Sequence, residues 1–284
     1  VQLGIDFKVF DFEKDYKQKV VDYMIEEYKR GRTPNPDIMC NQEVKFKLFL
    51  DTALDDGAEM IATGHYARTQ DGRLFMAEDT LKDQTYFLYR VTADALHKTL
   101  FPLGGYTKAE VRSMATERGL WTAKKKESMG VCFVGQVGMR DFLAQYVEAT
   151  PGDIIEKESG LVLGRHDGAI FYTLGQRHGL NVGGGLPYYV VGKDMDRNIV
   201  YASRNMNDET MWREKVELTG IHWIGEPVAD GENLLVRLRH RGSLLPAVLQ
   251  GDTLVLNEPE RAVASGQSAV LYRDSQCIGG GIVS

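Results

Sequence analysis

The hydrophobic positions in the first half of the chain follow two periods, which alternate along the sequence. Residues 6–12 alternate between apolar and polar, as a half-buried β-strand does. The following segment places Val20, Met24 and Tyr28 one helical turn apart and ends at Gly31, a residue typical of helix C-termini. The pattern therefore predicts a strand followed by a helix.

The same alternation continues to about residue 119. A second helix is predicted over residues 37–55, with its apolar positions directed at a sheet (Val44, Leu48 and Phe49). MIAT (residues 60–63) reads as a buried strand that ends at Gly64 and His65. Thr107 and Glu110 then form a T-x-x-E capping box for a helix that closes at Gly119. Strands that alternate with helices predict a parallel α/β sheet.

After about residue 150 the pattern changes to short strands separated by glycine-containing turns. Residues 160–203 resemble a small β module, and residues 209–284 add strands at a spacing of roughly 8 to 12 residues, which favours a small antiparallel barrel. We therefore expect an α/β domain at 1–144, a small central domain at 145–207 and a C-terminal β-barrel at 208–284.

Composition narrows the class of protein. The 284 residues are 43% hydrophobic and carry a net charge of −6, which indicates a soluble globular protein whose nucleic-acid contacts, if present, come from local patches. No apolar run approaches the roughly 20 residues that cross a bilayer, so we expect no membrane association. Three widely spaced cysteines indicate a reducing compartment such as the cytoplasm, and no Cys/His cluster suggests a metal site.

Cys40 lies close to a predicted helix start, in TPNPDIMCN. Because Asn35 precedes Pro36, the helix cannot begin earlier, and we expect Asp37 to be its N-cap and Cys40 to lie in the first turn. Free backbone N–H groups there favour a thiolate, whereas the nearby carboxylate disfavours one and suits proton transfer better. From this stretch alone, a small buried cysteine in a capped helix is at least as good an interpretation.

Cys132 lies in KKKESMGVCFVG, just after three lysines (Lys124, Lys125 and Lys126). Close lysines would stabilise a thiolate or a persulfide, although a solvated lysine run before a core strand competes with this interpretation. We expect Cys277, near the end of the predicted barrel, to be an inert buried thiol. Arg237, Arg239 and Arg241 alternate in one predicted strand, which would place them on one face as a cationic stripe.

Seven motifs in one order resemble those of the bacterial tRNA-specific 2-thiouridylases, which replace the C2 oxygen of the wobble uridine with sulfur. The motifs are TPNPDIMCN, ATGHYAR, KDQTYFL, AKKKESMGVCFVG, YTLGQRHGL, YYVVGKD and SGQSAVLY. The resemblance covers essentially the whole chain. It implies a partial ATP-pyrophosphatase α/β domain, a small central domain and a C-terminal β-barrel.

The resemblance also implies a mechanism. ATP, with Mg²⁺, adenylates the C2 oxygen, and sulfur from a cysteine persulfide then displaces AMP. Cys132 matches the position that carries the persulfide, which a cysteine desulfurase or a relay protein supplies, and Cys40 matches the second catalytic cysteine; the two can end as a disulfide. Asp37 would be the general acid/base, and Asn35, Pro36 and Asp37 would line the place where the base docks.

Other positions match family contacts. Gly64 matches a nucleotide contact, and the positions that match tRNA contacts are His65, Lys82, Asp83, Gln84, Arg239, His240 and Gln267. From the residues alone, the KDQ motif would be a polar turn, His65 a surface group and Gln267 part of a solvated strand face.

One departure from the family concerns ATP. Family members begin with an SGGxDSS loop that binds phosphates through backbone amides, and this sequence has none, so we expect the chain alone to bind ATP poorly and to be inactive. Two alternatives therefore remain, namely an RNA-binding module without catalysis and a thiol–disulfide redox protein. The sequence leaves the oligomeric state open.

Overall fold

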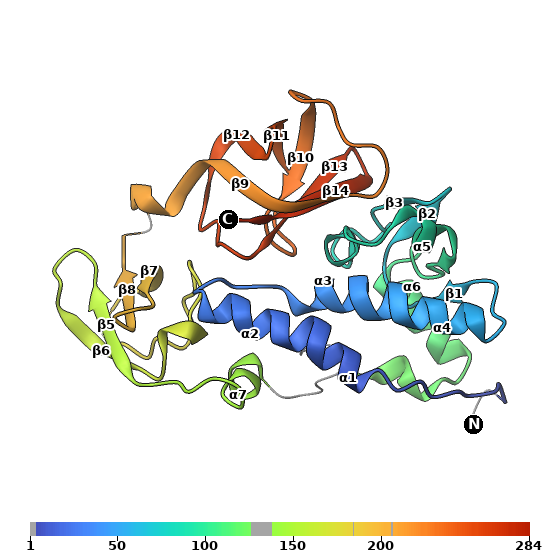
Figure 1. Cartoon of the computed structure of the whole chain (residues 1–284), viewed down its shortest axis with the longest axis horizontal. Coiled ribbons are helices and arrows are strands. Elements are labelled where there is room, and N and C mark those ends of the chain that lie inside the picture. Colours follow the sequence, from blue (N-terminus) through green and yellow to red (C-terminus); the bar gives the residue numbers. More distant parts are fainter. Residues whose placement is uncertain (1–3, 126–137, 184, 206) are drawn as a thin grey trace.

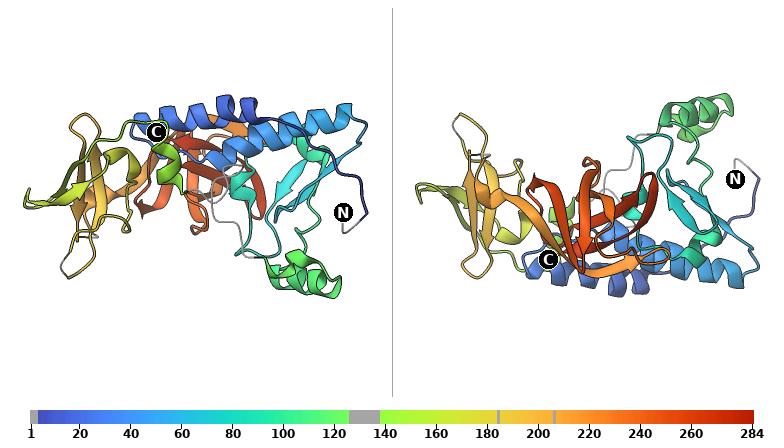
Figure 2. Two further views of the ribbon diagram at one scale, coloured as in Figure 1. Left: turned by 90° about the horizontal axis from the view of Figure 1, so that it is seen from below. Right: turned by 90° about the horizontal axis from the view of Figure 1, so that it is seen from above.

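The computed structural model describes residues 4–125, 138–183, 185–205 and 207–284. Three parts are visible in Figure 1: a barrel lies over two long helices, and a small β module lies to one side of them. We use "N-terminal region" for residues 4–125, "middle module" for the described residues of 138–205, and "barrel" for the strands from residue 212 onward. Figure 2 shows the same three parts from below and from above.

Two long helices form the base of the molecule. The first consists of α1 (Glu13–Tyr16), η1 (Lys17–Val21) and α2 (Asp22–Lys29), and the second of α3 (Pro36–Cys40), η2 (Asn41–Leu48) and α4 (Phe49–Asp55). Gly31 has φ +75°, a left-handed conformation that few other residues adopt, and it ends the first helix as predicted. Both predicted helices are therefore confirmed.

The expected strand at residues 6–12 is wrong. Residues 4–12 form neither helix nor strand, and Ile5, Phe7 and Val9 are exposed. A strand needs a neighbour to pair its backbone groups, and the part of the chain that the structure describes supplies none here. Alternation alone could not reveal whether such a neighbour exists.

A parallel pair of short strands supports the predicted α/β class. β1 (Ile61–Ala62) pairs in parallel with β4 (Thr99–Leu100), and α5 (Ala93–His97) immediately precedes β4. Further along are η3 (Thr85–Phe87), α6 (Lys108–Glu117) and η4 (Trp121–Lys124). Thr107 and Glu110 form the predicted capping box at the start of α6.

The middle module is built on a four-stranded sheet. Its order is β6-β5-β8-β7, with β5 and β8 parallel and the other pairs antiparallel. The elements are α7 (Met139–Leu143), β5 (Gly152–Glu156), β6 (Val162–His166), η5 (Ala169–Phe171), β7 (Tyr189–Asp194) and β8 (Ile199–Ser203). This sheet has its own hydrophobic core, in which Ile154, Val190 and Val200 are completely buried.

The C-terminal strands close into the predicted antiparallel barrel. Its order is β13-β10-β11-β12-β9-β14, and a β13–β14 pairing joins the ends. The elements are η6 (Glu209–Met211), β9 (Trp212–Trp223), β10 (Asn233–Arg237), β11 (Leu245–Gln250), β12 (Thr253–Arg261), β13 (Ser268–Arg273) and β14 (Gln276–Val283).

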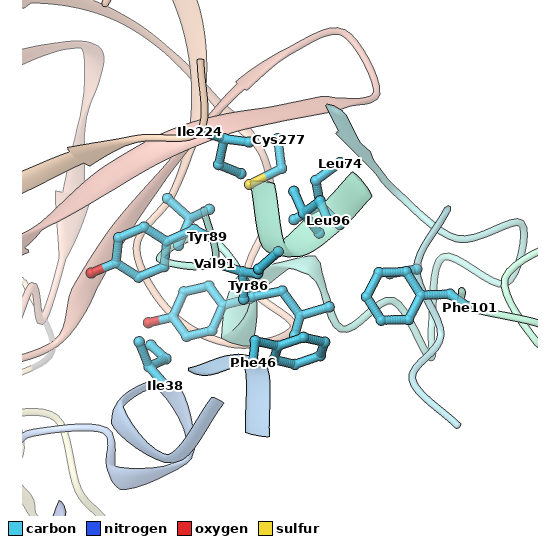
Figure 3. Packing of buried hydrophobic residues seen from close by; sticks show 14 of the residues in the cluster. Ile38, Phe46, Leu74, Tyr86, Tyr89, Val91, Leu96, Phe101, Ile224 and Cys277 are labelled. Carbon is cyan, nitrogen blue, oxygen red and sulfur yellow. The ribbon is translucent and has the colours of Figure 1, made fainter. Parts of the chain in front are cut away.

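A hairpin from the N-terminal region extends the barrel sheet. β2 (Arg68–Gln70) and β3 (Arg73–Phe75) pair with each other, and β3 pairs with β14 through Leu74 and Cys277. Behind this junction, residues of both parts share one hydrophobic core (Figure 3). The N-terminal region and the barrel therefore meet through backbone pairing as well as through side chains.

Candidate functional site

The N-cap of the second long helix is Asn35, two residues earlier than the sequence led us to expect. Asn35 has extended backbone angles (φ −111°, ψ 100°), and its side-chain oxygen accepts a hydrogen bond of 3.1 Å from the Asp37 amide. Pro36, which has no N–H to leave unpaired, is the first helical residue. Asn35 is thus the N-cap in place of Asp37, and Cys40 is the fifth helical residue. The argument that free first-turn amides favour a Cys40 thiolate does not hold.

Burial alternates along the start of this helix. Asn35 and Asp37 are partly accessible, whereas Pro36 and Cys40 are buried. Cys40 has no exposed surface and packs in a small cluster with Val20 and Val44 of the two long helices. Asp37 and Cys40 are three residues apart and so lie on one side of the helix, one turn from each other. A carboxylate at the surface with a thiol one turn deeper suits proton transfer next to sulfur chemistry.

Gly64 and His65 follow β1, at the carboxyl end of the parallel pair. Gly64 is exposed, and among the described residues the only atom near the position of a Cβ there is Leu103 Cδ1 at 3.9 Å, so they leave this edge open. The His65 ring lies between Phe46 and Phe101, and its Nδ1 lies 2.9 Å from Thr63 Oγ1. Burial, together with nearby Lys45, lowers the pKa of His65 to about 3. His65 is therefore a neutral ring in an aromatic setting.

The three residues of the KDQ motif have different environments. Asp83 is buried, and its carboxylate accepts hydrogen bonds from Ala77 N (3.1 Å), Thr85 Oγ1 (2.7 Å) and Arg237 Nη1 (2.9 Å). Gln84 Oε1 accepts from the Tyr66 amide at 2.9 Å. Lys82 and Gln84 are only partly buried. Lys82 and Gln84 can thus contact a ligand at the surface, whereas the buried Asp83 stabilises the segment through its hydrogen bonds.

The predicted cationic stripe in the barrel is wrong. β10 ends at Arg237, which is buried against Asp83, while Arg239 and Arg241 lie in the turn that follows. The alternation of arginines continues past the end of the strand, so it does not define one face. Arg239 is exposed and its guanidinium lies 3.5 Å from Glu260.

His240 approaches the N-terminal region from the barrel side. Its ring centroid lies 4.4 Å from that of Phe87 and 6.1 Å from that of Tyr86. Burial, followed by nearby Arg241 and Arg237, lowers the pKa of His240. Phe87 and the KDQ motif belong to the same short segment, so the structure brings two of the four expected tRNA-contact regions, KDQ and Arg239–His240, close together.

Another of these regions, at Gln267, points inward. Gln267 Nε2 donates a 2.6 Å hydrogen bond to the carbonyl oxygen of Thr33, two residues before the N-cap Asn35. Sequence reasoning missed Thr33, because no periodicity or motif chemistry marks a threonine in a loop. The only available signal was its place within the TPNPDIMCN motif.

The remaining cysteines differ in what the structure describes. Cys132 and the preceding Lys126 lie outside the described residues. Lys125 lies with its ammonium 5.9 Å from the Trp121 ring centroid. Cys277 is completely buried in the shared core, and burial raises the pKa of its thiol well above the usual range.

The nucleotide contact expected at Gly64 stays a prediction. The open edge at Gly64 suits a base or ribose. The nearest glycine-rich turn, before α6, is not free for phosphate, because Asp79 accepts from the Lys108 amide and Glu110 accepts from the Thr107 amide. In the ranges that the structure describes, no group of three or more His, Cys, Asp or Glu side chains is arranged to hold a metal ion. Nor is any described helix long and apolar enough to span a bilayer.

Comparison with known protein families assigns all three parts of the chain. Residues 1–136 match the tRNA methyl transferase HUP domain, residues 140–204 the tRNA methyl transferase PRC-barrel domain, and residues 213–283 the aminomethyltransferase beta-barrel domain. These matches agree with the α/β class and with the closed antiparallel barrel.

Three relatives that match nearly the whole chain share one description. The chain is 45% identical over 295 residues to the tRNA-specific 2-thiouridylase MnmA of Bacillus licheniformis and 42% identical over 294 residues to that of Bacillus subtilis. Each alignment covers 99% of this chain and 79% of the relative. The corresponding protein of Exiguobacterium sibiricum is 44% identical over 293 residues, or 99% of this chain and 78% of the relative. The chain therefore belongs to the family of tRNA-specific 2-thiouridylases, which are tRNA-uridine 2-sulfurtransferases.

Proposed function

We propose that this protein forms 2-thiouridine in tRNA, using ATP to activate the C2 oxygen of the wobble uridine and a cysteine persulfide as the source of sulfur. The observation that carries the proposal is the identity of 42–45% to 2-thiouridylases across 99% of the chain. The capped helix start at Asn35–Cys40 supports it, because it presents a carboxylate at the surface with a thiol one turn deeper.

The proposed reaction has two chemical stages. ATP first transfers its adenylyl group, with Mg²⁺, to the C2 oxygen and releases pyrophosphate. The terminal sulfur of a Cys132 persulfide then bonds to C2, and AMP leaves with the former carbonyl oxygen. Cys40 attacks the Cys132 sulfur, which breaks the S–S bond, leaves sulfur on C2 and joins the cysteines as a disulfide. The two thiols supply the two electrons that reduce the transferred sulfur, and an external thiol reductant restores them.

The described residues have defined parts in this reaction. Asp37 moves a proton as sulfur adds, and Asn35, Pro36 and Asp37 form the docking place of the base. Because Cys40 has no exposed surface, its attack requires the contacts with Val20 and Val44 to open locally. A pyrimidine reaches such a site only after unstacking, at a cost of a few kcal/mol that is smallest in an unpaired loop. The anticodon loop meets this condition.

The tRNA contacts in this proposal lie on two surfaces. His65 follows β1. The segment of Lys82 and Gln84 meets that of Arg239 and His240 through the Phe87–His240 ring contact and the Asp83–Arg237 ion pair. Asp83 acts from inside the protein through Arg237. Gln267 is proposed as a further contact, and Gly64 as part of the nucleotide site. A cysteine desulfurase or a sulfur-relay protein in the cytoplasm would deliver the persulfide sulfur.

The experiment that tests the proposal measures 2-thiouridine in tRNA by nucleoside mass spectrometry, with ATP and a persulfide donor supplied. It uses the chain joined to a family segment that carries the SGGxDSS loop, because the chain alone is expected to be inactive. We expect Cys40→Ser, Cys132→Ser and Asp37→Asn each to lower product formation at least about 100-fold, as loss of a general acid/base or nucleophile does. Cys277→Ala is the matched control, because this thiol lies in the core away from the helix start, and it should retain activity. Normal product formation by a variant would reject the role of that residue.

A salt titration separates the proposal from the redox alternative. Several phosphate contacts predict that tRNA affinity falls steeply as salt is added. A protein that only exchanges thiols and disulfides should bind tRNA weakly at every salt concentration. Binding without any product, measured on the chain joined to the SGGxDSS segment, would instead favour the RNA-binding module.

A further inference from the structure

The barrel and the middle module both contact one residue of the N-terminal region, Thr33. The Thr33 amide donates to Ser265 O of the barrel at 2.9 Å, and the Thr33 carbonyl oxygen accepts from Gln267 Nε2 at 2.6 Å. The Thr33 hydroxyl lies 3.1 Å from the hydroxyl of Thr173 in the middle module. Both backbone groups and the side chain of Thr33 are therefore engaged by residues that lie at least 140 positions away in the sequence.

The barrel loop approaches Thr33 at close range. Gly266, between Ser265 and Gln267, has φ +89°, and an added Cβ would lie 2.8 Å from the Thr33 nitrogen and 2.9 Å from Arg32 Cβ. Only glycine fits without displacing the backbone of the N-terminal region. In the SGQ motif (Ser265–Gln267), Gly266 and Gln267 thus each have a structural reason, whereas Ser265 contributes its backbone carbonyl.

The third contact comes from a well-ordered turn of the middle module. The Thr173 amide donates to Gln176 Oε1 at 3.0 Å, and the backbones of Gly175 and Gln176 both bond to Val190 in β7. Thr173 is consequently fixed to the sheet of the middle module. Any shift of that sheet relative to the barrel must change the distance between the hydroxyls of Thr33 and Thr173.

We propose that Thr33 is a positioning residue: it links the barrel and the middle module to the segment that carries Asn35 and Asp37. Only Pro34, which is buried, separates Thr33 from the N-cap. The hydrogen bonds of Thr33 with Ser265, Gln267 and Thr173 therefore fix where the helix starts. They also fix how the side chains of Asn35 and Asp37 face the substrate base. The catalytic part of this inference rests on the proposed function, whereas the positioning of the segment does not.

The inference assigns Gln267 a different role from that of a direct tRNA contact. A residue that only binds tRNA changes the affinity for tRNA, whereas a residue that positions Asn35 and Asp37 changes the rate once tRNA is bound. The two roles can therefore be separated by measuring the tRNA dissociation constant and kcat for the same variant.

The decisive variants are Thr33→Val and Gln267→Glu. Thr33→Val keeps the shape and removes the hydroxyl that meets Thr173, and Thr33→Ser restores the hydroxyl as the matched control. Gln267→Glu keeps the size but places a carboxylate oxygen against the Thr33 carbonyl. Two quantities are measured: hydrogen exchange of the amides of Thr33 and Asp37–Cys40, and the tRNA dissociation constant together with kcat for 2-thiouridine.

We expect faster exchange at Thr33 and Asp37–Cys40 in both variants. We also expect a fall in kcat of about fivefold for Thr33→Val at an unchanged tRNA dissociation constant, as loss of one hydrogen bond predicts. A larger fall in kcat is expected for Gln267→Glu. Thr33→Ser should behave as the unaltered protein does. Unchanged exchange in both variants, or a weakened tRNA affinity at constant kcat, would overturn the inference. The exchange measurement needs no turnover, so it decides the positioning of the segment even if the unaltered protein forms no 2-thiouridine.

Discussion

The barrel joins its two neighbours in different ways. Against the N-terminal region, it shares a hydrophobic core in which Tyr86, Leu74 and Val91 pack with Ile224 and Cys277 (Figure 3). The β3–β14 pairing continues the sheet across the same junction, and Asp83 and Arg237 form an ion pair with side chains 0% and 9% exposed.

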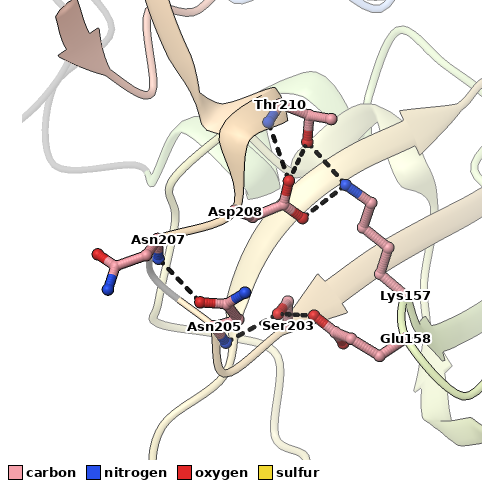
Figure 4. Close-up of polar contacts among 7 residues, drawn as sticks. All are labelled: Lys157, Glu158, Ser203, Asn205, Asn207, Asp208 and Thr210. Carbon is pink, nitrogen blue, oxygen red and sulfur yellow. Dashed lines mark hydrogen bonds and ion pairs between the residues drawn. The ribbon is translucent and has the colours of Figure 1, made fainter.

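Against the middle module, polar groups dominate. Lys157 contacts both the Asp208 carboxylate at 2.5 Å and Thr210 Oγ1 at 2.7 Å, next to the start of the barrel (Figure 4). Arg261 of the barrel lies over the Tyr189 ring, 5.9 Å from its centroid. The middle module keeps its own core, which contains no barrel residue among those described.

This difference indicates which parts move together. Apolar burial and sheet pairing are lost only at a large free-energy cost, whereas exposed polar contacts exchange readily with water. The barrel and the N-terminal region should thus behave as one body. The middle module meets the barrel mainly through polar groups, but its α7 shares a buried apolar cluster with the first long helix, in which Phe142 and Leu143 pack with Tyr28. It is therefore tied to the N-terminal region more firmly than to the barrel, and Thr33 lies where all three parts meet.

The largest effect is expected from Asp83→Asn or Arg237→Met. Removal of one member of a buried ion pair leaves the other charge uncompensated and costs about 3–5 kcal/mol. Chemical denaturation should show this loss in the free energy of unfolding of the N-terminal region and the barrel together. If the double variant loses much less than the sum of the single losses, the pair itself carries the coupling. A loss below about 1 kcal/mol in both single variants would contradict the idea of one body.

His65 provides a pH test within the same body. Its pKa is about 3 in the folded protein and 6.5 ordinarily, so the unfolded state binds more protons between these values. The stabilisation is therefore full above about pH 6.5 and falls as the pH drops toward 3. Denaturant titrations at several pH values should show a smaller slope for His65→Phe. An equal slope in both proteins would show that His65 is not the titrating group.

The smallest effect is expected at the contact with the middle module. Lys157→Met should lower the free energy of unfolding by at most about 1 kcal/mol, as exposed ion pairs typically do. Hydrogen bonds from Lys157 and Thr210 lower the pKa of Asp208 to about 2, so the contact should persist at neutral pH and weaken only as the pH falls toward 2. Small-angle scattering should show a nearly unchanged distance distribution in this variant, because α7 still packs against the first long helix. A cooperative loss of the barrel fold would show that the contact is not peripheral.

Several parts of the fold could be predicted from the sequence because they depend on local chemistry. Gly31, the capping box at Thr107 and Glu110, and the short strands after residue 209 follow rules that operate within a few residues. The N-cap was predicted two residues late, although Pro36 at the first helical position already favours Asn35.

The parts that the sequence did not reveal depend on distant partners. Arg237 resembles its arginine neighbours until Asp83, 154 residues earlier in the chain, is brought against it. The contact of Gln267 with Thr33 spans 234 residues. The expected strand at residues 6–12 depends likewise on a neighbour that no local pattern specifies.

The burial of Cys40 and Cys277 in separate clusters gives the molecule two internal reporters. In reduced protein, a small alkylating reagent should modify Cys40 when the two long helices separate, whereas Cys277 should react only when the barrel comes apart from the N-terminal region. The order in which the two thiols are alkylated would therefore distinguish a local opening between the two long helices from separation of the barrel and the N-terminal region.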